Sequence, residues 1–144
     1  DSVKKYQKTK IHNSTKIFQA LRILVNKEIS ELINALINSF HLIPIGGVIA
    51  VVTFHSIEDK IVKFFFKHYS EERNSSRYMP NEEVSEKCFK IINKKPILPS
   101  FKEVSQNPPS RSAKLRYAIK INQKCNFNDL KEKFKYLTDV EELR

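Results

Sequence analysis

Residues 48–59 read VIAVVTFHSIED, an apolar run joined directly to a cluster of polar side chains. The first seven residues of this stretch carry no charge, and no turn residue separates them from His55. Such an uninterrupted run predicts a strand covered on both faces, as in the parallel sheets of α/β proteins. Ligand crevices in these sheets open at the carboxyl ends of the strands, so we expect His55, Glu58 and Asp59 to face a crevice or its wall.

Helical patterns flank this strand. Before it, apolar residues recur at three- and four-residue steps, which predicts one amphipathic helix over residues 15–41. Pro44, Gly46 and Gly47 would end that helix. After the strand, a second helix is expected from Ile57 to about His68. Ser56 and Asp59 have the spacing of a capping box, which would explain these two residues without any chemistry but leaves His55 unexplained.

The residue pattern in the second half of the chain predicts a pair of antiparallel strands and two helices. Residues 88–98 have a strand pattern, and residues 113–121 alternate between apolar side chains and a face with Lys114, Arg116 and Lys120. Residues 70–83 predict a polar loop, and Ser100 with Glu103 predicts a short capped helix. Residues 126–144 predict a helix, for which packing on its own domain and contact with a partner both remain open.

Composition limits the classes of function. The chain has 144 residues, enough for one domain, and a net charge of +10, which favours a polyanionic partner such as nucleic acid. No apolar run approaches the roughly 20 residues of a membrane helix, so no membrane partner is expected. Cys88 and Cys125 are expected to be reduced thiols. No metal site is predicted, because neither has a second Cys or a His at zinc-ligand spacing.

Three segments resemble one protein family. Residues 15–26, TKIFQALRILVN, are similar to a family stretch TRTFQALRIAVN, and residues 54–63, FHSIEDKIVK, are similar to FHSLEDRIVK. Residues 107–116, NPPSRSAKLR, are similar to NPRARSAKLR, with Pro109 in place of an Arg. The chain thus resembles the carboxyl-terminal part of the 16S ribosomal RNA cytosine-N4 methyltransferases of bacteria and organelles, which use S-adenosylmethionine.

The resemblance implies an α/β fold, the carboxyl-terminal half of a Rossmann-like class I methyltransferase fold, with a parallel strand and a terminal antiparallel strand pair. Residues 1–13 would be a basic lead-in at the end of an inserted helical domain. Residues 14–121 would form the carboxyl-terminal lobe of the core, and residues 122–144 a helical extension. The residues that bind S-adenosylmethionine would lie upstream, so none is assigned in this segment. We expect a piece of a longer chain that is inactive alone.

The candidate site residues form three groups. His55 or Asp59 would line the crevice near the target base and accept the amine proton; alternatively, His55 anchors a loop and the acids cap a helix. Gln19, Arg22 and Asn26 share one side of the first helix, where they would bind RNA or the inserted domain, although Arg22 would equally suit an ion pair with Glu58 or Asp59. Arg111, Lys114 and Arg116 would bind phosphate or form a solvated face.

The resulting functional expectation is part of a methyltransferase that modifies N4 of a cytosine in small-subunit ribosomal RNA. The alternative is a non-catalytic lobe for RNA binding or oligomerisation. The expected partners are this RNA or its particle, the missing amino-terminal half and a second copy of the chain. The expected location is the bacterial cytoplasm, with an organelle left open.

Overall fold

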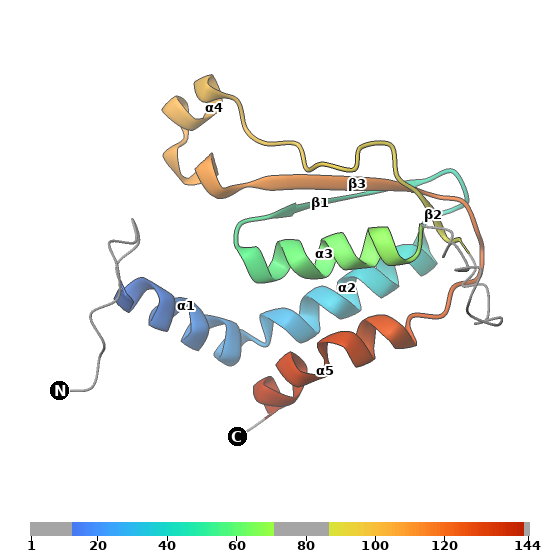
Figure 1. The fold of residues 1–144 in the computed structure, drawn as a ribbon, viewed down its shortest axis with the longest axis horizontal. Helices are drawn as coiled ribbons and strands as arrows, with labels where there is room; N and C mark the ends of the chain where they lie inside the picture. The colour runs from blue at the N-terminus through green and yellow to red at the C-terminus, as the bar shows by residue number, and fades with distance from the viewer. Residues whose placement is uncertain (1–12, 71–86, 143–144) are drawn as a thin grey trace, which may run out of the picture.

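The computed structural model describes residues 13–70 and 87–142 (Figure 1). In chain order the elements are α1 (Asn13–Asn26), α2 (Glu28–Leu42), β1 (Val48–Thr53), α3 (Ser56–His68), β2 (Phe89–Lys90), α4 (Phe101–Gln106), the 3₁₀ helix η1 (Pro108–Ser112), β3 (Lys114–Lys120) and α5 (Asn128–Glu142). None of the described helices is long and apolar enough to cross a membrane. The predicted lead-in and polar loop lie almost entirely outside the described residues.

The described strands form a three-stranded antiparallel sheet in the order β1-β3-β2. The predicted antiparallel pairing of the last two strands is confirmed. However, β1 also pairs antiparallel, with Val51 opposite Arg116, and the described residues contain no parallel partner for it. The strand predicted over residues 88–98 is mostly wrong, since only β2 and an isolated bridge between Ile97 and Leu115 pair with β3. Pro96, which has no N–H to donate, precedes that bridge.

Helices cover one face of the sheet only. In Figure 1, α2, α3 and α5 all lie on the same side of β1 and β3. The buried aromatic core includes Phe40 of α2, Phe65 of α3 and Phe89 of β2. On the opposite face of β1, Val48 and Val52 are 54% and 53% exposed. No described helix covers this apolar face of the sheet.

The face of β3 that packs against the helices is therefore the one that carries the lysines, and not the apolar face that its alternating pattern predicts. Ala118 and Lys120 are fully buried under the helices, whereas Leu115, Tyr117 and Ile119 are only half-buried. Lys120 tolerates burial because its Nζ donates to the carbonyls of Phe40, at 2.8 Å, and Ile43, at 2.9 Å. The ammonium thus satisfies orphan carbonyls at the carboxyl end of α2, where a positive charge is stabilising.

The prediction of one helix over residues 15–41 is wrong. Lys27 adopts a left-handed conformation, with φ of 52°, and separates α1 from α2. The N–H groups in the first turn of α2, which have no partner within the helix, donate to the buried carboxylate of Glu141. Its oxygens lie 2.8 Å from Ile29 N and 2.9 Å from Ser30 N. The apolar face of α1 then projects away from the core, and Phe18 is 71% exposed.

The carboxyl-terminal helix packs on its own domain, which confirms one of the two readings of residues 126–144. Leu130 and Phe134 of α5 are buried in the same core as α2 and α3. The N–H of Leu130 donates to the Tyr69 hydroxyl at 3.1 Å. Burial raises the pKa of Tyr69 to about 12 despite this hydrogen bond, and the negative charge of Asp129 adds to the increase.

Cys88 and Cys125 form a disulfide, so the expectation of two reduced thiols is wrong for this structure. Their Cα atoms lie 6.0 Å apart although 37 positions separate them in the sequence. The bond connects the start of β2 to the segment before α5. The spacing of the two cysteines gave no sign of this pairing, because only the tertiary fold brings them together.

Candidate functional site

The candidate site is built on the first turn of α3, directly after β1. His55 is the N-cap of this helix, and its Nδ1 accepts a hydrogen bond from the Glu58 N–H at 3.4 Å. The Glu58 carboxylate in turn accepts from the N–H groups of Phe54, at 2.8 Å, and His55, at 3.3 Å. A capping box is therefore present, but His55 and Glu58 form it rather than the predicted Ser56 and Asp59.

This cap determines which nitrogen of His55 carries a proton. Because Nδ1 accepts a hydrogen bond, the neutral ring carries its hydrogen on Nε2. The side chain is only 10% exposed, and Nε2 lies 3.0 Å from Glu58 Oε1 without forming a hydrogen bond to it. The basic lone pair of the ring is thus used by the helix cap. This arrangement suits an anchoring role better than removal of a proton from a substrate.

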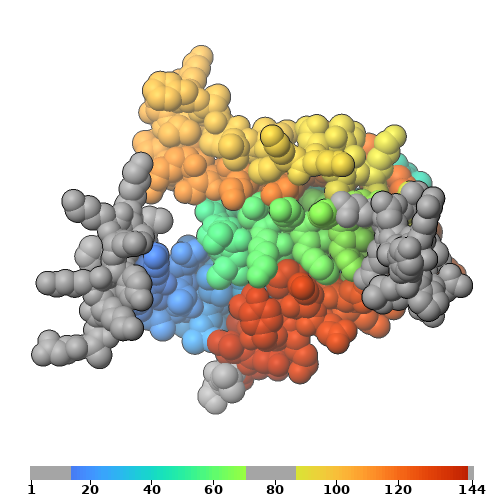
Figure 2. Space-filling model, viewed as in Figure 1, coloured from blue at the N-terminus to red at the C-terminus, as the bar shows by residue number. Residues whose placement is uncertain are grey.

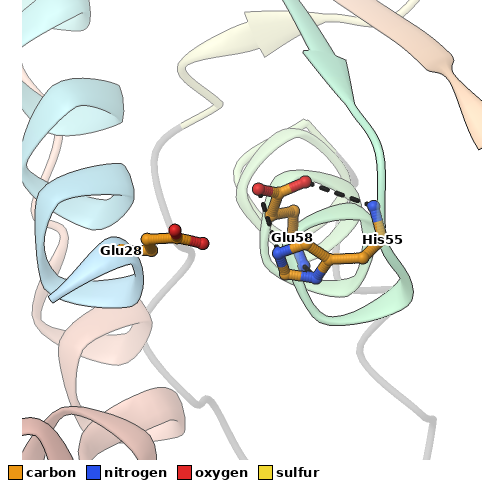
Figure 3. Close-up of side chains that lie close together, drawn as sticks. All are labelled: Glu28, His55 and Glu58. Atoms are coloured by element: carbon orange, nitrogen blue, oxygen red, sulfur yellow. Dashed lines mark hydrogen bonds and ion pairs between the residues drawn. The ribbon is translucent and has the colours of Figure 1, made fainter. Parts of the chain in front are cut away.

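Glu28, the first residue of α2, lies close to His55 and Glu58. Figure 3 shows its carboxylate facing the pair formed by His55 and Glu58, and ligand atoms of the three residues lie within 4.8 Å of one another. Glu28 Oε1 lies 2.8 Å from Arg22 Nε and 3.3 Å from Asn26 Nδ2. Burial opposes ionisation of Glu28, but the hydrogen bonds from Arg22 and Asn26 and the nearby positive charge lower its pKa overall.

The same three side chains have the composition of a metal site, but their contacts do not fit one. A metal ion would need the Nε2 lone pair, whereas the hydrogen bond to Nδ1 leaves the hydrogen on Nε2. Both carboxylate oxygens of Glu28 contact the Arg22 guanidinium. We therefore interpret this cluster as the cap of α3 lying beside an ion pair that joins α1 to α2.

Asp59 forms the second cluster with two cations of β3. Its carboxylate lies 2.7 Å from Arg116 Nε and 3.2 Å from Lys114 Nζ. Asp59 and Arg116 are largely buried, with side chains 14% and 11% exposed. Burial alone would raise the pKa of Asp59, but the hydrogen bonds and charges of Arg116 and Lys114 outweigh it and lower this pKa. A carboxylate held ionised in this way is a weak proton acceptor.

The structure brings most of the predicted site residues together. Arg22 and Asn26 bind Glu28, which lies close to His55. Lys114 and Arg116 bind Asp59 in the first turn of α3. Gln19 is half-buried on α1, about one turn before Arg22. Arg111 lies apart in η1, is exposed and donates to the Pro108 carbonyl at 3.3 Å.

The sequence reading missed Glu28. Residues 22 and 28 are six positions apart, a spacing that places them on different faces of a continuous helix. Only the break at Lys27 brings them into contact. The left-handed conformation of a lysine gives no sequence signal that would have revealed this pair.

Comparison with known proteins identifies the family. A model of the MraW methylase family matches residues 2–121, which include β1, both site clusters and β3. This chain is a member of the MraW methylase family. Helix α5 follows the last matched residue.

Its relatives include proteins named ribosomal RNA small subunit methyltransferase H. The one from Sinorhizobium fredii is 44% identical over 123 residues, covering 85% of this chain and 36% of the relative. The one from Bartonella henselae is 43% identical over 122 residues, covering 85% of this chain and 35% of the relative. This MraW family chain thus spans about a third of the length of the curated relatives it matches.

Proposed function

We propose that this chain is the carboxyl-terminal lobe of an S-adenosylmethionine-dependent enzyme that methylates N4 of a cytosine in small-subunit ribosomal RNA. The family and the names of the relatives support the reaction class and the RNA. The position of His55 and Asp59 directly after β1 supports the location of the crevice.

The apolar face of the sheet that no described helix covers supports the proposal that this chain is one lobe of a larger fold. The exposed Val48 and Val52 lie opposite Ile119 and Leu115, so the uncovered surface is apolar and continuous across two strands. Sheets in Rossmann-like folds have helices on both faces. We assign the second helical layer and the parallel neighbour of β1 to the missing amino-terminal half. A second copy of the chain is the alternative cover for this face.

The described residues do not fit S-adenosylmethionine as a ligand. The only two glycines of the chain, Gly46 and Gly47, precede β1 at the end opposite the candidate crevice. They are also engaged in the sheet, since Gly46 N donates to the Lys120 carbonyl and Lys120 N donates to the Gly47 carbonyl, both at 2.8 Å. We therefore assign the cofactor site to the missing half and derive no step through it from these residues.

Within this scheme, His55 and Asp59 position the wall of the crevice beside the target cytosine. Methylation of an exocyclic amine requires an unstacked base held in line with the methyl group. His55 fixes the backbone turn after β1, and Asp59 holds Arg116 and Lys114 toward the same region. In an intact enzyme, we expect His55→Ala to lower turnover by up to about 100-fold through misplacement of the base. Unchanged turnover with the fold intact would remove His55 from the site.

The proposed RNA contacts are six polar residues, five of them on α1 and β3 and the sixth, Arg111, apart in η1. Arg22 and Arg111 are exposed enough to reach phosphate, whereas Arg116 is largely buried and is held by Asp59. Gln19, Asn26 and Lys114 complete the set. We place the enzyme in the bacterial cytoplasm, with an organelle as the alternative. The competing function, a non-catalytic RNA-binding lobe, would retain these contacts without any methyl transfer.

A chimera tests the proposed function. The chain replaces the aligned 123-residue segment of the relative from Sinorhizobium fredii, and the product is incubated with labelled S-adenosylmethionine and unmethylated small ribosomal subunits. Nucleoside analysis of the RNA is expected to show N4-methylated cytidine. A folded chimera that binds the methyl donor but modifies no cytosine would overturn the proposal.

A further inference from the structure

A cavity of about 540 Å³ lies between α3 and the segment after β2. This volume is typical of a pocket for a small ligand or a single nucleotide. In Figure 2 the segment that follows residue 87, in yellow, lies along the upper side of α3, in green. The cavity occupies the place where this segment leaves β3, because pairing stops after Lys90 opposite Ile119 and resumes only at Ile97 opposite Leu115.

The lining of this cavity is strongly basic. Lys63 and Lys67 come from α3, Lys90 and Lys94 from the β2 segment, and Arg116 from β3. None of the described lining residues is acidic. Within the described part of the chain, no carboxylate lies within ion-pair distance of Lys63, Lys90 or Lys94. Unneutralised ammonium groups around a concave site attract a polyanion.

Aromatic and amide groups lie between these cations. The half-buried ring of Tyr117 lines the cavity, and its hydroxyl accepts a hydrogen bond from Asn93 Nδ2 at 3.3 Å. Phe66 and Phe89 supply an apolar floor. An aromatic ring, an amide and several lysines form the combination that binds an unstacked base together with its phosphates.

We propose that this cavity is a docking site for a single-stranded RNA segment, separate from the crevice at the end of β1. Lys63, Lys90 and Lys94 bind phosphates, and Tyr117 stacks against one base, with Asn93 beside its edge. The choice of RNA over another polyanion rests on the proposed function. Arg116 lines the cavity and also holds Asp59, so the docking site borders the wall of the proposed crevice.

The first test measures the binding of a fluorescent, single-stranded oligoribonucleotide to this chain at several salt concentrations. The triple substitution Lys63→Ala, Lys90→Ala and Lys94→Ala is expected to weaken binding and to flatten the plot of log affinity against log salt by about two units. The matched control replaces three exposed lysines elsewhere, Lys102, Lys131 and Lys135, by alanine. It removes the same net charge and is expected to change the slope little.

The second test uses an oligonucleotide of the same length that lacks its bases. The unmodified chain is expected to bind the base-bearing RNA about tenfold more tightly, and Tyr117→Leu is expected to abolish this preference. Tyr117→Phe should retain it, because the ring remains. Circular dichroism verifies the fold of each variant.

Equal losses in the lysine variant and its control would overturn the docking site, since binding would then follow net charge alone. Equal affinity for duplex DNA of the same length, or a preference for bases that survives Tyr117→Leu, would also overturn it. None of these outcomes bears on methyl transfer by the chimera, so the docking site and the proposed function can fail separately.

Discussion

Asp59 shows how one carboxylate joins two elements. It is the fourth residue of α3 and binds Arg116 and Lys114 of β3, so the start of the helix and the sheet are connected through a largely buried ion cluster. Removal of the Asp59 charge would leave the largely buried Arg116 charge without its partner. The resulting loss of stability is larger than the net stabilisation that the ion pair provides.

Asp59→Asn is expected to lower the free energy of unfolding at neutral pH by about 1–3 kcal/mol, because its charged hydrogen bonds with Arg116 and Lys114 are weakened. The folded-state pKa of Asp59 lies below the ordinary value of an aspartate, because the hydrogen bonds and charges of Arg116 and Lys114 outweigh the effect of burial. Its contribution to stability is therefore fully present above that value and is lost as the pH falls through the lower, folded-state pKa. Urea unfolding between neutral pH and acid should show a smaller loss of stability in the variant.

The control for this experiment is Asp139→Asn, which removes an exposed carboxylate that pairs with Lys135. It should change stability by less than about 0.5 kcal/mol. An acid-induced loss of stability that is the same in the Asp59 variant and the unmodified chain would contradict the role of this cluster.

At the same scale, sequence reasoning found the residues of the site but not their partners. His55 and Asp59 were identified from their position after an apolar strand, and both lie there. The capping role of His55 was missed because histidine is not among the usual N-cap residues. The outward direction assumed for Lys120 was wrong because alternation along a strand cannot tell which face the helices cover.

The elements themselves were largely predictable, whereas the break between α1 and α2 was not. The apolar periodicity continues through Lys27, so pattern alone favours one helix. The structure bends there because Glu141, more than 100 positions away, binds the N–H groups at the start of α2. Such a long-range cap leaves no trace in a local sequence pattern.

Lys27→Gly tests the break directly. A lysine with φ of 52° is strained, and glycine relieves this strain, so the free energy of unfolding is expected to rise by about 1 kcal/mol. In a continuous helix the same change would lower it by a similar amount. Chemical denaturation gives the sign, and Lys16→Gly inside α1 is the control that should be destabilising.

Glu141→Ala tests the long-range cap. Its carboxylate accepts three hydrogen bonds, from Ile29 N, Ser30 N and Ser30 Oγ, and is buried. Truncation is expected to lower the free energy of unfolding by about 2–3 kcal/mol. The neighbouring, exposed Glu142→Ala should change it by less than about 0.5 kcal/mol. Equal effects of the two substitutions would show that α5 does not cap α2.

On the scale of the whole molecule, the described fold is covered on one side only. The helical layer of α2, α3 and α5 is held together by a continuous aromatic core, while the other face of the sheet and the apolar face of α1 remain exposed. The family could be predicted from the sequence through three short segments. An exposed apolar face is what a half-sheet should have, but which face stays uncovered could not be predicted, because it depends on where the helices pack.

The disulfide between Cys88 and Cys125 belongs to this scale because it closes a long loop around β3. Reduction is expected to lower the free energy of unfolding by about 4 kcal/mol through the chain entropy regained on unfolding. Unfolding in urea with and without dithiothreitol measures the difference. Two freely alkylated thiols in the purified chain, before any reductant is added, would contradict the bond.

We propose that this chain supplies one lobe of a methyltransferase and not the half that binds the methyl donor. Isothermal titration calorimetry with S-adenosylmethionine tests it directly, with the chain alone and with the chimera that restores the missing half. We predict no measurable binding to the chain alone and saturable binding to the chimera. Tight, saturable binding to the chain alone would contradict the assignment of the cofactor site to the missing half.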